Sequence, residues 1–147
     1  MWAQGGSRDV LNKLIRYYFD AKEDFRLAAK RAEATECRTE LDKLVDEREE
    51  FHMQLQQELS RFGVEPSDNG TGAADLKRDW ERVRGSLSGH GLDSALKLAD
   101  QSDGHALEQI GLLFSRDLPE DIRALLEKHA DALRAARSRC HELCHTS

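Results

Sequence analysis

The sequence predicts an all-α fold, a four-helix bundle in which two antiparallel hairpins are joined by a long crossover that carries a short extra helix. Apolar residues recur every three or four positions along four long segments, the spacing that lays one stripe along a helix. The chain has only two prolines, and 34% of its residues are charged, which suits long helices with solvated outer faces. Its length is enough for one domain but not for two, so residues 1–147 are expected to form a single domain.

The first hairpin is expected over residues 8–62. One helix spans about 9–33, and a short turn at 34–35 separates it from a second helix over about 36–62. Gly63 follows the last apolar position and is expected to end the second helix in a C-cap role. The apolar stripe of the first helix consists of Leu11, Leu14, Ile15, Tyr18, Phe25, Ala28, Ala29 and Ala32, and that of the second of Cys37, Leu41, Leu44, Phe51, Leu55, Leu59 and Phe62.

The crossover is expected over residues 63–91. It begins with ten residues of loop composition, and a short helix then places Leu76, Trp80, Val83 and Leu87 on one side. The second hairpin, 92–145, has a Pro119 where a helix start tolerates proline. Its two stripes are formed by Leu92, Leu96, Ala99, Ala106, Leu107, Ile110 and Phe114, and by Ile122, Leu125, Leu126, Leu133, Ala136, Cys140 and Leu143. Four long helices in two hairpins, joined by one long connection, have the topology of ferritin-like bundles.

Composition argues against several classes of function. The net charge of −6 would repel a phosphate backbone, so nucleic-acid binding is not expected. No apolar run approaches about 20 residues and the N-terminus lacks an apolar signal region, so we expect a cytoplasmic protein that does not enter membranes. The three cysteines are an odd count, which favours thiols over a disulfide framework. No phosphate-binding glycine motif or Ser-His-Asp pattern identifies a small-molecule substrate.

Four polar residues fall within the apolar stripes, one on each long helix. They are Lys22, Arg48, Asp103 and His129. Counted from the two hairpin turns, all four lie at similar depth, so they are expected to share one layer in the middle of the bundle. The simplest interpretation of this buried polar layer is a network of ion pairs and hydrogen bonds that fixes the helix register.

The same depth is where ferritin-like di-iron proteins place carboxylate and histidine ligands. Here two of the four positions, Lys22 and Arg48, are cationic and would repel a metal ion. A Glu-x-x-His string ends at His52, but its glutamate projects away from the apolar stripe. The alternative to a purely structural layer is an iron site that uses His52, Asp103 and His129.

The C-terminal segment offers a second possible metal site. Cys140 and Cys144 are spaced i and i+4 on one helix face, and His141 and His145 share a neighbouring face. Cys37 lies near the turn where this helix is expected to end, so thiolates and imidazoles could together bind zinc or copper. Two other interpretations stay open: the cysteines complete the apolar stripe, or Cys37 and Cys140 form an oxidisable pair.

Several segments spread over nearly the whole chain form a familiar pattern: Leu11-Asn12-Lys13-Leu14-Ile15, Asp20 to Phe25, Arg48 with Phe51 and Leu55, Glu58-Leu59, Gly63 with Glu65-Pro66, Trp80, Leu87-Ser88-Gly89-His90, and Asp117-Leu118-Pro119 with Ile122-Arg123. This pattern resembles a bacterial family of unknown function classed as ferritin-like four-helix bundles. The resemblance implies a ferritin-like fold without an established activity, in a family often suspected of metal binding or a stress response. Arg48 matches an arginine of that family, whereas Lys22 and Arg137 stand where a carboxylate or histidine ligand would be sought.

Together, these features favour a non-enzymatic structural or interaction protein whose mid-bundle metal site is absent or vestigial. The alternative is a metal-binding or redox protein that uses the mid-bundle residues or the C-terminal cysteines and histidines. A homodimer is expected from the fold. Trp2, Tyr17 and Phe19 lie off the core stripe and are the candidates for an exposed apolar contact.

Overall fold

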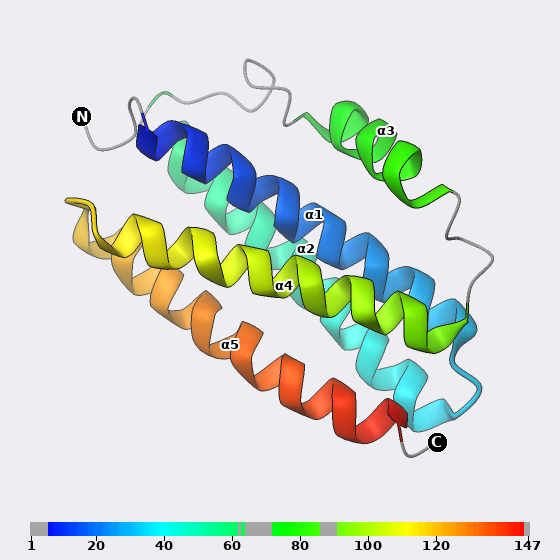
Figure 1. Ribbon diagram of the computed structural model, residues 1–147. Coiled ribbons are helices and arrows are strands. Elements are labelled where there is room, and N and C mark those ends of the chain that lie inside the picture. The colour runs from blue at the N-terminus through cyan, green and yellow to red at the C-terminus, as the bar shows by residue number, and fades with distance from the viewer. Residues whose placement is uncertain (1–5, 62, 64–71, 86–90, 146–147) are drawn as a thin grey trace.

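The computed structural model describes residues 6–61, 63, 72–85 and 91–145, apart from the side chains at 141 and 143–145. These residues form five α-helices and no strand, namely α1 (Gly6–Arg31), α2 (Thr35–Arg61), α3 (Ala73–Arg84), α4 (Leu92–Phe114) and α5 (Glu120–His145) (Figure 1). The all-α prediction is confirmed, and the four long helices lie within a few residues of their expected ranges. None of the described helices is both long enough and apolar enough to cross a membrane.

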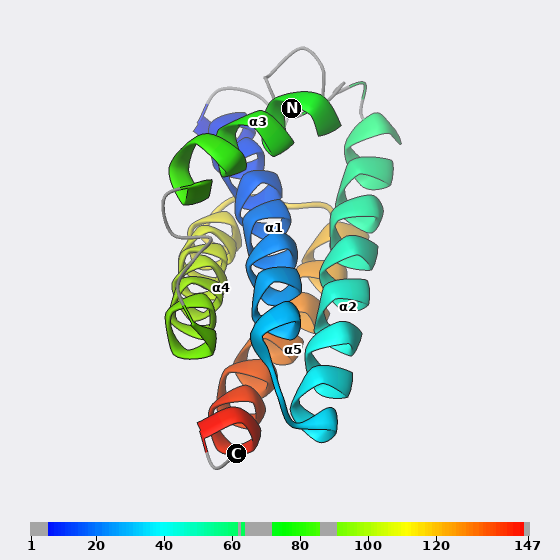
Figure 2. The same ribbon diagram turned by 90° about the vertical axis from the view of Figure 1, so that its right-hand side faces the viewer.

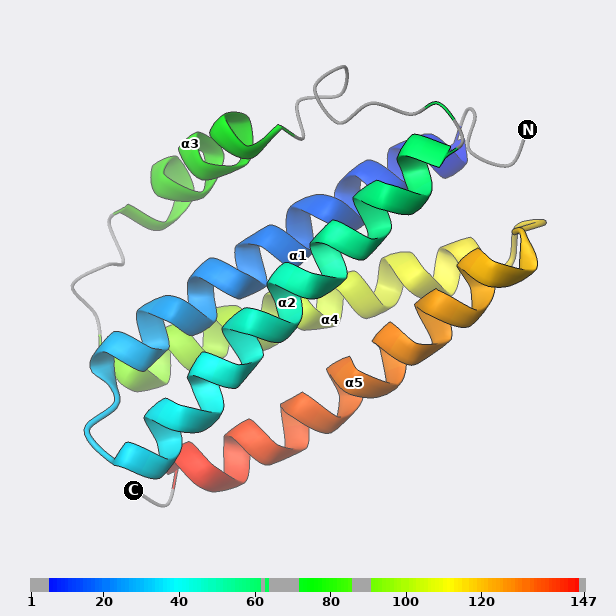
Figure 3. The same cartoon turned by 180° about the vertical axis from the view of Figure 1, so that it is seen from behind.

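The four long helices lie side by side, with α3 on the outside of α1 (Figure 2). α1 packs beside α2 and α4, and α5 packs beside the same two helices, so α1 and α5 are diagonal neighbours, as are α2 and α4. α2 folds back on α1, and α5 folds back on α4 (Figures 1 and 3). Because α4 begins at the opposite end of the bundle from the end of α2, α2 and α4 run in the same direction.

The ends of two helices follow from local sequence. Gly63, just beyond α2, has a φ of 78°, a conformation that glycine adopts without steric strain, and its backbone N–H donates to the carbonyl of Ser60 at 3.0 Å. Pro119 precedes α5, where the missing N–H of proline is harmless, and its carbonyl accepts the first helical hydrogen bond from Arg123 at 3.0 Å.

The hydrophobic core consists of two clusters stacked along the bundle. One lies toward the start of α1 and includes Leu14, Leu55, Ile110 and Ile122; the other lies toward the end of α1 and includes Ala28, Leu41, Ala95 and Cys140. Arg48 and Asp103 fall between the residues of the two clusters along their helices. The bundle core is therefore interrupted by polar side chains near its middle.

A buried carboxylate fixes α3 to the bundle. Asp24 of α1 is fully buried and accepts hydrogen bonds from Trp80 Nε1 at 3.0 Å, Arg84 Nε at 3.1 Å and Ser102 Oγ at 2.8 Å. Asp24 lies outside the apolar stripe predicted for this helix, and it is buried because α3, together with Ser102 of α4, covers that face of α1. Val83 was expected on the inner side of α3, but it is 56% exposed, since Arg84 makes the inward contact in the last turn.

Candidate functional site

The centre of the bundle holds a buried ion pair between two diagonal helices. Arg48 of α2 is completely buried, and Asp103 of α4 is 1% exposed. The guanidinium donates through Nε to Asp103 Oδ1 at 3.0 Å and through Nη2 to Asp103 Oδ2 at 2.8 Å. It also donates to Glu47, which lies nearer the surface. This two-bond geometry is the strong form of an arginine–carboxylate contact and leaves neither carboxylate oxygen of Asp103 unpaired.

The charges of this pair depend on each other. Burial lowers the pKa of the Arg48 guanidinium, but the carboxylates of Asp103 and Glu47 raise that pKa by more, so its net shift is upward. Burial raises the pKa of Asp103, and Arg48 offsets part of that rise. The contact is an ion pair, because arginine keeps its proton in proteins and both carboxylate oxygens of Asp103 accept hydrogen bonds from it.

His129 of α5 is held between two hydrogen-bond partners. Its Nδ1 lies 2.9 Å from the hydroxyl of Tyr18, and its Nε2 lies 2.9 Å from Oε1 of Gln54. Its ring stacks on Phe51 with centroids 3.9 Å apart. Burial, helped by the charge of Arg48, lowers the pKa of His129 to about 3. The imidazole is therefore neutral at physiological pH, and both of its nitrogens are engaged within the protein.

Lys22 lies at the edge of the bundle rather than in contact with this centre. Its ammonium donates to Glu49 at 2.7 Å and lies 4.4 Å above the ring of Phe19. The hydrogen bond from Lys22 lowers the pKa of Glu49. His52 packs edge-on against Phe19, and its buried Nε2 has no hydrogen-bond partner within the described part of the chain. Burial lowers the pKa of His52 to about 4.

The four residues expected to share a buried layer are all at most 9% exposed. Of these, only Arg48 and Asp103 contact each other directly, whereas His129 and Lys22 bind other residues. The sequence did not reveal the partners Tyr18 and Gln54, because tyrosine fits an apolar stripe and glutamine fits a solvated face.

Metal ligands do not gather among the residues whose side chains are described, since no group of three His, Cys, Asp or Glu there is close enough to hold an ion. At the C-terminal end, Cys37 is disulfide-bonded, so its expected roles as a thiolate ligand and as a thiol are wrong. Cys140 is a free, buried thiol, which excludes the interpretation, left open by the sequence, in which Cys37 and Cys140 form a pair. The side chains of the other candidates, His141, Cys144 and His145, lie outside the described residues.

A second polar cluster, which the sequence did not indicate, surrounds Asp24. Asp20 lies on the same helix, one turn earlier, and burial together with the charge of Asp24 raises the pKa of Asp20 to about 6. Arg84 contacts Asp24 from α3, and Ser102 contacts it from α4. The signal that could have found this cluster is the spacing of Trp80 and Arg84, i and i+4, which puts two donors on one side of a short helix.

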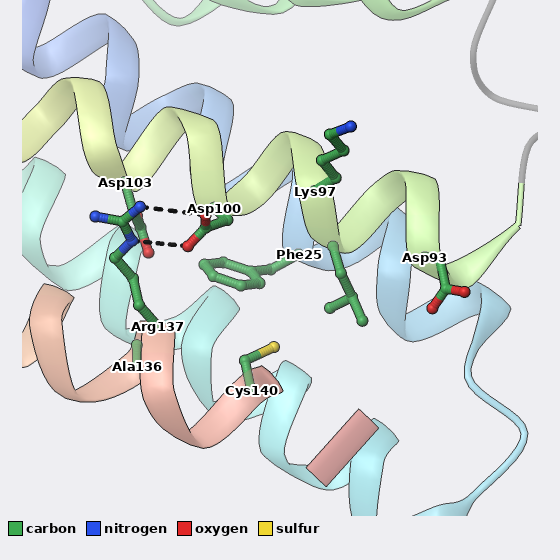
Figure 4. A pocket seen from close by; sticks show the side chains of 9 residues that line it. Phe25, Asp93, Lys97, Asp100, Asp103, Ala136, Arg137 and Cys140 are labelled. Atoms are coloured by element: carbon green, nitrogen blue, oxygen red, sulfur yellow. Dashed lines mark hydrogen bonds and ion pairs between the residues drawn. The ribbon is translucent and has the colours of Figure 1, made fainter. Parts of the chain in front are cut away.

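A pocket of about 400 Å³ opens between α4 and α5, beside the buried ion pair (Figure 4). Phe25, Leu96, Ala136 and Cys140 supply apolar walls, and Asp103 lies at its inner side. Other lining residues are charged and lie nearer the surface, namely Asp93, Lys97, Asp100 and Arg137. A second hollow, of about 450 Å³, lies between α1 and α3 and is lined by four cationic side chains, those of Lys22, Arg26, Lys30 and Lys77, besides Phe19 and Trp80.

Comparison with known proteins gives a family but no activity. Residues 7–113 match the family described as "Domain of unknown function (DUF2383)". The match covers α1, α2 and α3 and nearly all of α4, and therefore includes Arg48 and Asp103. No curated protein and no solved structure matches the chain. Since the matched segment covers well over half of the sequence, the chain belongs to this DUF2383 family of unknown function.

Proposed function

We propose that this protein is a non-enzymatic, ferritin-like bundle with a structural or interaction role, in which a polar network replaces the mid-bundle metal site. The topology supports the ferritin-like assignment. α2 and α4 run in the same direction, and α3, which lies between them in the sequence, packs on the outside of α1. Ferritin-like folds contain one such crossover between two hairpins.

The observation that carries the proposal is the complete burial of Arg48 against Asp103. A dinuclear metal centre in a dry core needs several carboxylates to neutralise two divalent cations. Here a guanidinium already neutralises the buried aspartate, and the nearby imidazole of His129 uses both nitrogens within the protein. A metal cation at this position would be repelled by the positive charge of Arg48 and could bind only if that side chain moved away.

Elemental analysis tests this proposal directly. The purified, untagged protein would be incubated with iron, manganese, zinc and copper in turn, desalted, and measured beside a di-iron bundle protein as positive control. We expect no stoichiometric retention of iron or manganese. Retention of roughly two equivalents, the number in a dinuclear site, would overturn the proposal. Retention of about one zinc or copper that is lost in Cys140→Ser would instead support a metal site at the C-terminal end.

We also propose that the chain forms a homodimer in a cytoplasmic setting. We base the dimer on the fold class, and no single surface among the described residues identifies the interface. Phe19, one candidate for the contact, is only 5% exposed. Tyr17 is partly buried and stacks on His105, with ring centroids 5.1 Å apart. Trp2 lies outside the described residues. Sedimentation equilibrium over a hundredfold range of concentration would measure the association, and a monomer throughout that range would contradict it.

A further inference from the structure

The pocket between α4 and α5 reaches from the surface to the centre of the bundle. Its walls include Phe25, Leu96, Ala136 and Cys140, which are only 3%, 8%, 5% and 8% exposed, and it borders Asp103 at 1% exposure. Figure 4 shows the ring of Phe25 at the back, with Cys140 facing it from α5. A volume of about 400 Å³ lies within the range of small-molecule sites and exceeds the voids of an ordinary packed core.

The carboxylate at the inner side of this pocket and one ion pair at its mouth already have partners. Both oxygens of Asp103 accept hydrogen bonds from Arg48. At the mouth, Arg137 of α5 donates to both oxygens of Asp100 of α4, at 2.7 and 3.2 Å. Lys97 projects away from the space between Phe25 and Cys140 (Figure 4). A charged ligand would therefore find no free counter-charge in the inner part and would lose its hydration on entering.

The thiol of Cys140 lines the pocket, but it is a weak nucleophile because it is protonated. Burial raises the pKa of its thiol to about 11, and Asp103 and Asp100 add to that rise, so the sulfur is a neutral apolar surface at physiological pH. The inner walls thus present an aromatic ring, aliphatic groups and an uncharged thiol.

We propose that this pocket is a binding site for a small, uncharged, apolar organic molecule, which packs against Phe25, Leu96 and Cys140. The ligand is expected to be uncharged because the carboxylate of Asp103 and the Arg137–Asp100 pair are already neutralised. It is expected to be small because the pocket has a limited volume and is enclosed by residues of α1, α4 and α5. The site is separate from the mid-bundle position considered for metal, because Asp103 turns its carboxylate oxygens toward Arg48.

The test uses N-phenyl-1-naphthylamine, an uncharged aromatic probe that fluoresces when it enters an apolar site. Wild-type protein should show a saturable increase with about one probe per chain, as for a single defined pocket. Ala136→Phe fills the pocket from a buried position and should weaken binding at least about tenfold. Ala135→Phe makes the same change at the neighbouring exposed position and should leave the affinity unchanged. Far-ultraviolet circular dichroism of both variants separates loss of the site from loss of the fold.

A second measurement needs no substitution in the walls. Alkylation of Cys140 by iodoacetamide would be followed by peptide mass spectrometry in the wild-type protein, with Cys140→Ser as control. At ten times its dissociation constant, the probe should slow alkylation of Cys140 about tenfold by simple mass action. Probe binding that leaves this rate unchanged, or that survives in Ala136→Phe, would place the probe elsewhere and overturn the proposal. A probe displaced by raising the protein concentration, in parallel with dimer formation, would make the pocket a subunit interface and overturn it as well.

Discussion

Removing the Arg48–Asp103 ion pair one partner at a time should destabilise the protein far more than replacing both partners together. Arg48 is fully buried and Asp103 is 1% exposed, so removing Arg48 would leave an unpaired carboxylate in the core, and removing Asp103 would leave a buried guanidinium with only Glu47 as its carboxylate partner among the described residues. We expect Arg48→Met to lower the free energy of unfolding by about 3–5 kcal/mol, the usual cost of an orphaned buried ion, and Asp103→Leu to act similarly. The double variant removes both charges, so it should be within about 2 kcal/mol of wild type. The coupling energy between the two sites would then be at least about 3 kcal/mol.

Urea denaturation at pH 7 would measure all four proteins, with equal m-values as the check that unfolding stays two-state. The control is the same cycle at Arg137 and Asp100, which are also joined by two hydrogen bonds but are 42% and 50% exposed. That exposed pair should show a coupling of less than about 1 kcal/mol. If the Arg48–Asp103 coupling energy is as small as that of the control, the conclusion that Arg48 and Asp103 form a charged, mutually stabilising pair in the core is wrong.

Three further outcomes are expected. The pKa of His129 falls from 6.5 to about 3 on folding, so the unfolded chain binds more protons below pH 6.5 and stability decreases as the pH is lowered. His52 titrates in the same way in both proteins, so from pH 7 to 5 wild type should lose about 2 kcal/mol more than His129→Gln; equal losses in urea titrations of the two would refute this. The pKa of Asp20 is raised to about 6, so its negative charge opposes folding above that pH. Asp20→Asn should therefore raise the free energy of unfolding by about 1–2 kcal/mol at pH 7 and by little at pH 4. An equal effect of the substitution on the melting temperature at both pH values would argue against this. In the folded protein, Cys140 should react with iodoacetamide much more slowly than in the urea-unfolded protein. Cys37 should stay unmodified in the folded and in the unfolded protein until a reductant is added, and alkylation of Cys37 without reductant would contradict its disulfide state.

Periodicity predicted the helices and many of the buried positions on them, but not the burial of Asp24 and Phe19 or the exposure of Val83. The spacing of Leu11, Leu14 and Tyr18 fixes one inner face on α1, and all three residues are at most 1% exposed. The same periodicity placed Arg48 and Asp103 inward, since each replaces an apolar residue in its stripe. Gly63 ended α2 as expected, because its conformation is a local property.

What the sequence could not supply were contacts between elements. Asp24 lies outside the apolar stripe of α1, so periodicity did not predict its burial; Trp80 of α3 and Ser102 of α4 together cover it. His129 was expected to join Arg48 and Asp103, but its position on α5 directs it to Tyr18 and Gln54 instead. Which buried polar group binds which depends on helix rotations of a few tens of degrees, and a pattern with a period of 3.6 residues does not define these.

The diagonal contacts also determine when, during synthesis, the first hairpin can become stable. Arg48 finds its partner 55 residues later in the chain, and Tyr18 finds His129 111 residues later. Until the ribosome has released α4, Arg48 on the hairpin of α1 and α2 has no Asp103 to pair with, so its guanidinium must stay hydrated. In the finished protein the same guanidinium is buried away from water. The hairpin of α1 and α2 therefore cannot complete its own interior. The bundle closes only when α5 supplies the imidazole of His129, which pairs with the hydroxyl of Tyr18 on α1.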